Sequence, residues 1–288
     1  MSVITFVNNG EEQTGKTMSL VAIATQMAIN YNEKILIIST TNKEDKIKSC
    51  YFEEQQVKRI RKGLFGNRTS SILDVESGIE GIAKMARSNK LTSDMITNYT
   101  KVVFKDRLEV ILGATSKRPE QATEYDNKGI EEEYTDLINV AKEYYDRIFV
   151  DLDNNLSTEI RKKIIDISDL IMVCTSQNLN SIKKLEQNKE KSQLLQSKKT
   201  LFLIGRYDKF SKYNIKNVTR YLNEKKQILV IPYNTLYFEA SNEAGVPDLF
   251  LRLQRISDSD DRNIIFIQEV KRATETIIYR LQELETMI

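Results

Sequence analysis

The segment from Gly10 to Thr17 constrains the fold of this chain more than any other. It reads Gly-Glu-Glu-Gln-Thr-Gly-Lys-Thr and matches the pattern G-x-x-x-x-G-K-[ST], in which backbone N–H groups of a loop surround phosphate oxygens. Val3–Val7, just before it, is a β-branched and aromatic run typical of a buried strand. Residues 18–31, just after it, carry apolar side chains around much of a helix. Strand, glycine loop and helix therefore follow in the order that a phosphate-binding loop requires, and a chance match in a surface turn is the weaker interpretation.

Runs that resemble strands recur between helical patterns along the chain. Several of these runs are apolar throughout, as in strands that are covered on both faces. The alternation predicts an α/β fold, a three-layer sandwich whose mainly parallel, twisted sheet has helices on both faces. Further strands are predicted at 34–38, 108–112, 147–152, 170–173, 201–204 and 228–231, and helices at 158–167, 180–196 and 215–222.

The chain predicts a single domain over residues 1–288, because its three prolines and ten glycines form no linker. Residues 42–106 are charged and mostly helical in pattern, and we expect a helical elaboration there between the second and third strands. Residues at about 260–288 predict a C-terminal helix whose apolar side docks on the domain.

Composition excludes several kinds of chemistry. The chain has no histidine, which removes the usual general base. Cys50 and Cys174 lie far apart in sequence and form no CxxC pair, which argues against zinc, iron–sulfur and disulfide sites. No apolar run reaches the roughly 18 residues of a membrane span, and no signal peptide is evident, so we expect a cytoplasmic protein.

The remaining candidates for chemistry are carboxylates, lysine, backbone amides and a bound metal. Lys16 is expected to reach the β- and γ-phosphates of a nucleotide, and the Thr17 hydroxyl to bind Mg²⁺. Asp151 ends the apolar run that begins at Ile148 and is the expected second metal ligand, with a solvated strand end as the alternative. Asp153 could assist the metal, help to position water, or begin the next turn. The catalytic candidates are Lys16, Asp151 and Asp153.

Four further segments match, in order, the landmarks of one known family. These are Tyr145–Asp151, Ser168–Thr175, Leu201–Tyr207 and the stretch 231–247, which contains Glu-Ala-Ser-Asn at 239–242. On these residues the chain resembles the ParA/MinD group of deviant P-loop ATPases, with the MinD pattern most similar. The resemblance implies ATP and Mg²⁺ as cofactors and a nucleotide-dependent homodimer. It also implies a cofactor site made of Gly10, Glu11, Glu12, Gln13, Thr14, Gly15, Lys16, Thr17, Met18, Arg206 and Pro232, the last two beside the adenine.

The chain departs from this family at positions tied to hydrolysis. The family's signature lysine, five positions before the P-loop lysine, is replaced by Glu11. At about 4 Å and an effective dielectric near 20, one such charge contact is worth about 4 kcal/mol of either sign. The family's aspartate after the second strand is missing from residues 39–42, and the first acids are Glu44 and Asp45. We expect ATP binding with weak or partner-dependent hydrolysis. Whether Glu11 points inward, to solvent or to a partner lysine stays open.

The resemblance implies that the dimer positions or recruits a partner assembly, with plasmid, division, pilus or flagellar cargo. A nucleotide-binding scaffold that does not hydrolyse ATP is the alternative, and the absent cysteine pairs argue against a metal-cluster carrier. The tail after Arg280 contains Glu283 and Glu285 but no cation, so we do not expect it to anchor the protein to a membrane. Two basic clusters suit either nonspecific DNA or solvated helix faces: Lys58, Arg59, Arg61, Lys62 and Arg68; and Lys209, Lys212, Lys216, Arg220, Lys225 and Lys226.

Overall fold

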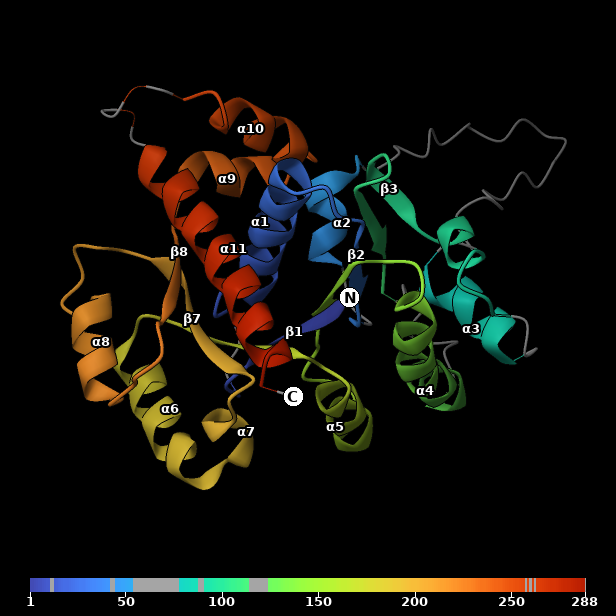
Figure 1. Cartoon of the computed structure of the whole chain (residues 1–288), viewed down its shortest axis with the longest axis horizontal. Helices are drawn as coiled ribbons and strands as arrows, with labels where there is room; N and C mark the ends of the chain where they lie inside the picture. The colour runs from blue at the N-terminus through green and yellow to red at the C-terminus, as the bar shows by residue number, and fades with distance from the viewer. Residues whose placement is uncertain are drawn as a thin grey trace, which may run out of the picture.

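The chain folds around one eight-stranded sheet (Figure 1). The computed structural model describes residues 1–10, 13–41, 45–53, 78–87, 91–113, 124–256, 258, 261 and 263–287. The strands are β1 (Ser2–Asn8), β2 (Ile35–Ser39), β3 (Lys101–Phe104), β4 (Leu108–Ile111), β5 (Arg147–Asp151), β6 (Leu170–Thr175), β7 (Thr200–Tyr207) and β8 (Leu229–Pro232). Their order across the sheet is β3-β4-β2-β5-β1-β6-β7-β8.

The sheet is parallel from β4 to β8, as the alternating pattern predicted. Only β3 runs antiparallel, paired with β4 at the edge of the sheet. This strand falls within 42–106, where the pattern predicted mostly helix, so that prediction was wrong for residues 101–104. The strand has only four residues, none of them buried, and a run that short shows no periodicity that would distinguish a strand from the end of a helix.

Alternate residues of the central strands fill two separate cores, one on each face of the sheet. Ile4 and Phe6 of β1 point into one core, and Val3 and Val7 point into the other. The first core is covered by α1 (Lys16–Asn30), α2 (Lys46–Tyr51), α9 (Thr235–Ala240), α10 (Val246–Leu253) and α11 (Ile264–Glu285). The second is covered by α3 (Ile79–Arg87), the 3₁₀ turn η2 (Ile96–Asn98), α4 (Glu124–Ala141), α5 (Thr158–Asp166), α6 (Leu179–Lys191), α7 (Gln193–Gln196) and α8 (Ile215–Tyr221).

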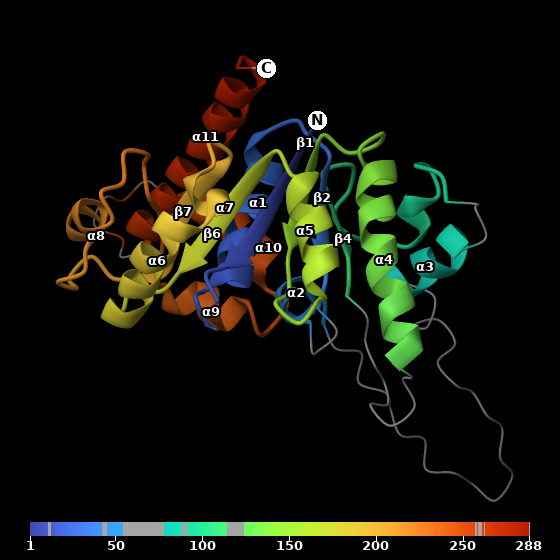
Figure 2. The ribbon, with the colours of Figure 1, turned by 90° about the horizontal axis from the view of Figure 1, so that it is seen from below.

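Figures 1 and 2 show these helices on both sides of the sheet, which confirms the predicted three-layer α/β class. The helix predicted at 180–196 is interrupted at Ser192. That residue is extended, and its hydroxyl accepts a hydrogen bond from Leu195 N, so it caps a new helix. Within the described residues, no helix is both long and apolar enough to cross a bilayer.

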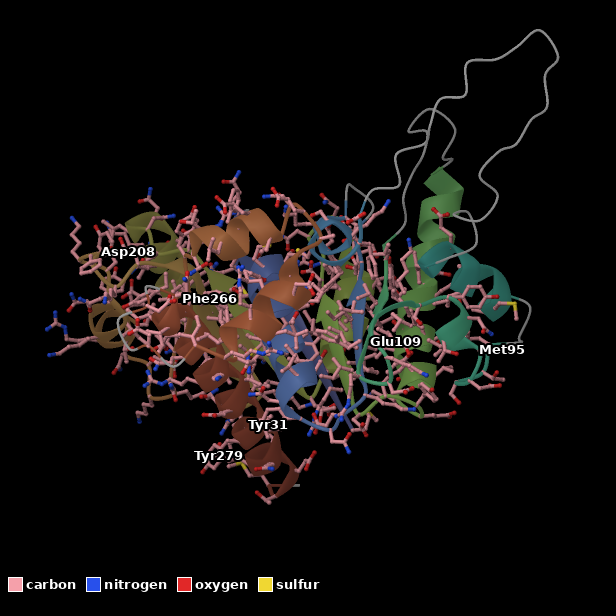
Figure 3. The ribbon with its side chains drawn as sticks, turned by 90° about the horizontal axis from the view of Figure 1, so that it is seen from above. Tyr31, Met95, Glu109, Asp208, Phe266 and Tyr279 are labelled. Carbon is pink, nitrogen blue, oxygen red and sulfur yellow. The ribbon has the colours of Figure 1, made fainter. Side chains whose placement is uncertain are left out.

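The seven parallel strands end at the same edge of the sheet, where the loops that follow them gather. In open α/β sheets this carboxyl edge is the usual place for a ligand. Figure 3 marks Asp208, on the loop after β7, and Met95, before η2, at opposite ends of the molecule. The loop after β1 lies between these ends because β1 is in the interior of the sheet.

Candidate nucleotide-binding site

In the loop between β1 and α1, three of the residues that the structure describes have a left-handed backbone conformation. Gly10, Gln13 and Gly15 have φ values of 69°, 60° and 81°. Glycine adopts this region without a Cβ penalty, and Gly15 directly precedes α1 as its N-cap. The first turn of α1 contains no acidic side chain. Its free N–H groups and the positive end of the helix dipole therefore favour an anion.

A glycine outside the loop, which the sequence analysis did not single out, packs directly against it. Gly205 of β7 lies against the loop so closely that a Cβ there would be 2.3 Å from Thr14 O and 3.0 Å from Gly15 Cα. Conversely, a Cβ on Gly15 would be 3.2 Å from Gly205 Cα. The loop can therefore pack this closely against β7 only if residue 205 is a glycine, which has no Cβ.

Lys16, Thr17 and Asp151 meet at the carboxyl end of β5. Lys16 Nζ forms an ion pair of 2.8 Å with Asp151 Oδ1, and each side chain is only 10% exposed. The same Nζ donates a hydrogen bond to Leu152 O. Thr17 Oγ1 donates to the other carboxylate oxygen, Asp151 Oδ2, at 2.7 Å. The residues proposed for phosphate and metal binding therefore lie within one contact of each other.

The donor set suits Mg²⁺ if the nucleotide supplies most of the ligands. The Thr17 hydroxyl and the Asp151 carboxylate are hard oxygen donors. Thr17 lies in the first turn of α1, directly after the loop, and Asp151 is the last residue of β5. No group of three or more acidic or cysteine side chains that could enclose a metal occurs in the part of the chain that the structure describes. Mg²⁺ usually keeps several waters and binds through one or two protein groups plus phosphates, which fits this pair.

A polar pocket of about 290 Å³ opens beside this triad, and we call it the phosphate-side pocket. Asp153 lies in it, and its side chain shapes a turn: Oδ1 accepts hydrogen bonds from Asn155 N and Nδ2 at 2.8 and 2.7 Å. Its backbone N donates to Thr40 Oγ1 at 2.8 Å. The lining residues are Asn8, Gln13, Lys16, Thr17, Thr41, Asp45, Lys46, Asp151, Asp153, Asn154 and Asn155.

Asp45 is the acid of this pocket that sequence reasoning did not place in the site. It is 5% exposed and caps α2, where Oδ1 accepts from Ile47 N at 3.0 Å. Oδ2 accepts from Gly113 N at 2.9 Å. Burial raises the pKa of the Asp45 carboxyl above its ordinary value, and the hydrogen bond from Gly113 opposes that rise. The sequence did not indicate that Asp45 belongs to the site, because it lies several residues after β2 and only the fold brings the start of α2 near Asp151.

A more apolar pocket of about 270 Å³ adjoins the loop on its other side, and we call it the base-side pocket. Arg206 and Pro232, the two residues expected beside the adenine, line it together with the loop. Tyr233 and Phe238, which are 57% and 50% exposed, add two aromatic rings that sequence reasoning missed. Both residues lie within the stretch 231–247 that matches the family, and that position could have indicated them. Further lining residues are Asn8, Gln13, Thr14, Gly15, Lys16, Thr17, Met18, Ser19, Lys46, Ile231, Asn234, Tyr237 and Ser241.

One expected cofactor-binding residue lies outside both pockets, and two others are not described by the structure. Glu11 and Glu12 lie outside the described residues. Gly10 borders neither pocket, and its carbonyl accepts a hydrogen bond from Lys184 Nζ at 2.9 Å. Of the two basic clusters, the one at 58–68 also lies outside the described residues. In the other, Lys226 Nζ is turned inward to carbonyl oxygens of Ser197 and Thr200.

A phosphate-binding loop between an interior strand and a helix, in a mainly parallel sheet with helices on both faces, defines the α/β P-loop NTPase class. No protein-family model and no curated protein matches the sequence. Solved structures that match include ATPases of the ParA and MinD kind.

A ParA family ATPase from Chlorobium tepidum TLS superposes with a TM-score of 0.63 at 15% identity, over 86% of this chain and 92% of that one. MinD from Pyrococcus horikoshii OT3, complexed with Mg-ADP, gives 0.61 at 14% identity, over 97% and 98%. A putative plasmid partition protein from Borrelia burgdorferi B31, bound to AMPPNP, gives 0.59 at 16% identity, over 99% and 98%. The chain thus has the ParA/MinD fold, as its motifs predicted.

Proposed function

We propose that this protein binds ATP with Mg²⁺ at the loop from Gly10 to Thr17 and forms a homodimer when the nucleotide is bound. The dimer positions or recruits a partner assembly, and ATP hydrolysis is weak or depends on that partner. The observation that carries the proposal is the contact of Lys16, Thr17 and Asp151 between a polar and an aromatic pocket. Structures of this fold from Pyrococcus and Borrelia hold Mg-ADP and AMPPNP.

The pockets divide the ligand into two parts. The aromatic rings of Tyr233 and Phe238 offer stacking surfaces for the base beside Pro232 and Arg206. The amides of the loop and of the first turn of α1 face the phosphates. With nucleotide bound, Lys16 would contact a phosphate oxygen in place of Asp151, and the Asp151 carboxylate would be available to hold the metal with Thr17. Bound Mg²⁺ would neutralise phosphate charge at Thr17 and Asp151.

Weak intrinsic hydrolysis follows from how the acids near the phosphates are already used. Asp151 is held by Lys16 and Thr17, Asp45 by two backbone amides, and Asp153 by Asn155. Both carboxylate oxygens of Asp151 and of Asp45 are therefore occupied, whereas Asp153 uses Oδ1 alone to hold its turn. A water-activating base needs an oxygen free to accept the water proton. A partner that reorients the turn after β5, which carries Asp153, would place such an oxygen at the phosphates.

Three measurements on the purified chain test the proposal. Equilibrium titration should show ATP and ADP binding in Mg²⁺, and Lys16→Ala should abolish it. Light scattering with a non-hydrolysable ATP analogue should show twice the monomer mass. Phosphate release should be slow without partners. Absence of ATP binding, or a mass unchanged by nucleotide, would refute the proposal.

The alternative is a scaffold in which nucleotide only stabilises the dimer. No measurable phosphate release under any condition, with dimerisation retained, would favour the scaffold. Fast turnover of the isolated protein would instead exclude impaired hydrolysis. DNA-stimulated release would favour a segregation role.

A further inference from the structure

Lys46 is the second lysine of the candidate site, and no motif pointed to it. It is the first residue of α2 and lines both the phosphate-side and the base-side pocket. Four other residues share that position: Asn8, Gln13, Lys16 and Thr17. Of the described residues, Lys16 and Lys46 are therefore the two cations at the junction of the pockets, since Arg206 lines the base-side pocket alone.

The two lysines differ in how their charge is used. Lys16 is already neutralised by Asp151 at 2.8 Å. Lys46 forms no ion pair with any residue that the structure describes, and its Nζ donates to the neutral amide oxygen of Asn242. Asn242 is fixed in turn, because its Nδ2 donates to Phe238 O at 2.8 Å. The ammonium is thus held in place without losing its charge.

The backbone that carries Lys46 is fixed as well. α2 packs on α1 and α10 (Figure 1). Asp45 caps its N-terminus, and Ser49 links it to the turn after α9: Oγ donates to Ser241 O and its carbonyl accepts from Ala244 N, each at 2.9 Å. The Lys46 side chain therefore begins from a rigid position at the pocket junction.

We propose that Lys46 is a phosphate-binding lysine that acts beside Lys16, and that Asn242 positions it. The inference rests on the proposed function, since it assigns Lys46 to the phosphates of the same nucleotide. A nucleotide with its base near Phe238 and its phosphates on the loop must cross the junction of the pockets, where Lys46 stands. An ammonium has three donors, so Lys46 keeps Asn242 while it binds phosphate oxygens.

The test compares ATP with inorganic tripolyphosphate, which has no base, in competition against a fluorescent adenine nucleotide. Lys46→Gln removes the charge but keeps a donor for Asn242. It should weaken both ATP and tripolyphosphate about tenfold or more, because charge-assisted hydrogen bonds are roughly twice as strong as neutral ones. Lys46→Arg should retain most of the affinity. Lys48→Gln, on the same helix but in neither pocket, is the matched control and should bind like the wild type.

Asn242→Ala tests the positioning role, with an expected loss smaller than that of Lys46→Gln for both ligands. Thermal melting of each variant checks the fold, and Lys46→Met replaces the glutamine variant if that one melts early. Wild-type affinity in the charge-removing variant overturns the inference alone. So does a loss for ATP without a loss for tripolyphosphate, which would indicate damage to the base side. If the wild type binds no ATP, the proposed function fails and the inference falls with it.

Discussion

Asp151→Asn should make nucleotide binding less dependent on Mg²⁺. In the free protein, Asp151 Oδ1 lies 2.8 Å from Lys16 Nζ, and both side chains are 10% exposed. At that distance and an effective dielectric of 20, the Coulomb attraction is about 6 kcal/mol, part of which offsets the cost of burial. Breaking a buried pair by removal of one partner typically costs about 3–5 kcal/mol, because the remaining charge is left without compensation.

The asparagine variant leaves Lys16 with the Leu152 carbonyl but without a counter-charge. Nucleotide phosphates then supply that charge without first displacing a carboxylate. Without Mg²⁺, binding to the variant should therefore be at least about tenfold tighter than to the wild type, equivalent to about 1.4 kcal/mol or more. With Mg²⁺ the variant should lose affinity, because a metal ligand has gone. The variant should also be less stable to urea by about 3 kcal/mol when no nucleotide is present.

The assay is titration of a fluorescent ADP analogue in EDTA and in Mg²⁺, with urea unfolding of the free proteins. Asp166→Asn is the control: it makes the same change in net charge at an exposed residue of α5. Binding in EDTA that is no tighter than that of the wild type would refute the idea that the ion pair holds Lys16 back. An unchanged Mg²⁺ dependence would refute Asp151 as a metal ligand.

Three further changes test other parts of the site. Gly205→Ala would place a Cβ 2.3 Å from Thr14 O, so it should destabilise the fold by about 1–3 kcal/mol and weaken ATP binding. Gly245→Ala, whose nearest contact would be 3.5 Å, should do neither in the same urea and titration experiments. Phe238→Ala should weaken ATP about twofold to tenfold through lost stacking and leave tripolyphosphate competition unchanged; equal losses would contradict a base role. Because burial raises the pKa of Asp45, the folded chain holds that proton more tightly than the unfolded chain. Wild-type stability relative to Asp45→Asn should thus rise as pH falls through the raised pKa, and a urea series with the opposite slope would refute this.

The sequence predicted the elements that carry strong local signals. The phosphate-binding loop could be placed because strand, glycines and helix are contiguous, and the Asp151 strand because its apolar run ends in an acid. Boundaries held to within a few residues for the buried strands. β3 and the break at Ser192 were missed because one depends on pairing at a sheet edge and the other on a single serine cap.

The missed site residues share a different cause. Asp45 and Lys46 lie on a short helix about 30 residues from the loop in sequence, and their side chains reach the site only because α2 packs beside α1. Gly205 lies in the segment Leu201–Tyr207, from which the sequence analysis selected only Arg206. The close approach to Thr14 O nevertheless requires a glycine at 205. Such roles depend on tertiary distances that no spacing along the chain encodes.

The charges of the site give a physical reason to expect that binding and hydrolysis separate under the proposed function. Lys16 and Asp151 neutralise each other in the free chain, so affinity is the difference between that pair and the contacts that replace it. Lys46 carries an extra positive charge held by a neutral amide, which favours phosphate without any exchange of partners. By contrast, both carboxylate oxygens of Asp45 accept from backbone amides, so using Asp45 as a base requires breaking a cap, and Asp153 would have to turn its second oxygen toward the phosphates while Oδ1 holds the turn. Under the proposed function we therefore expect the free protein to bind nucleotide as it stands, and hydrolysis to need a rearrangement that a partner stabilises.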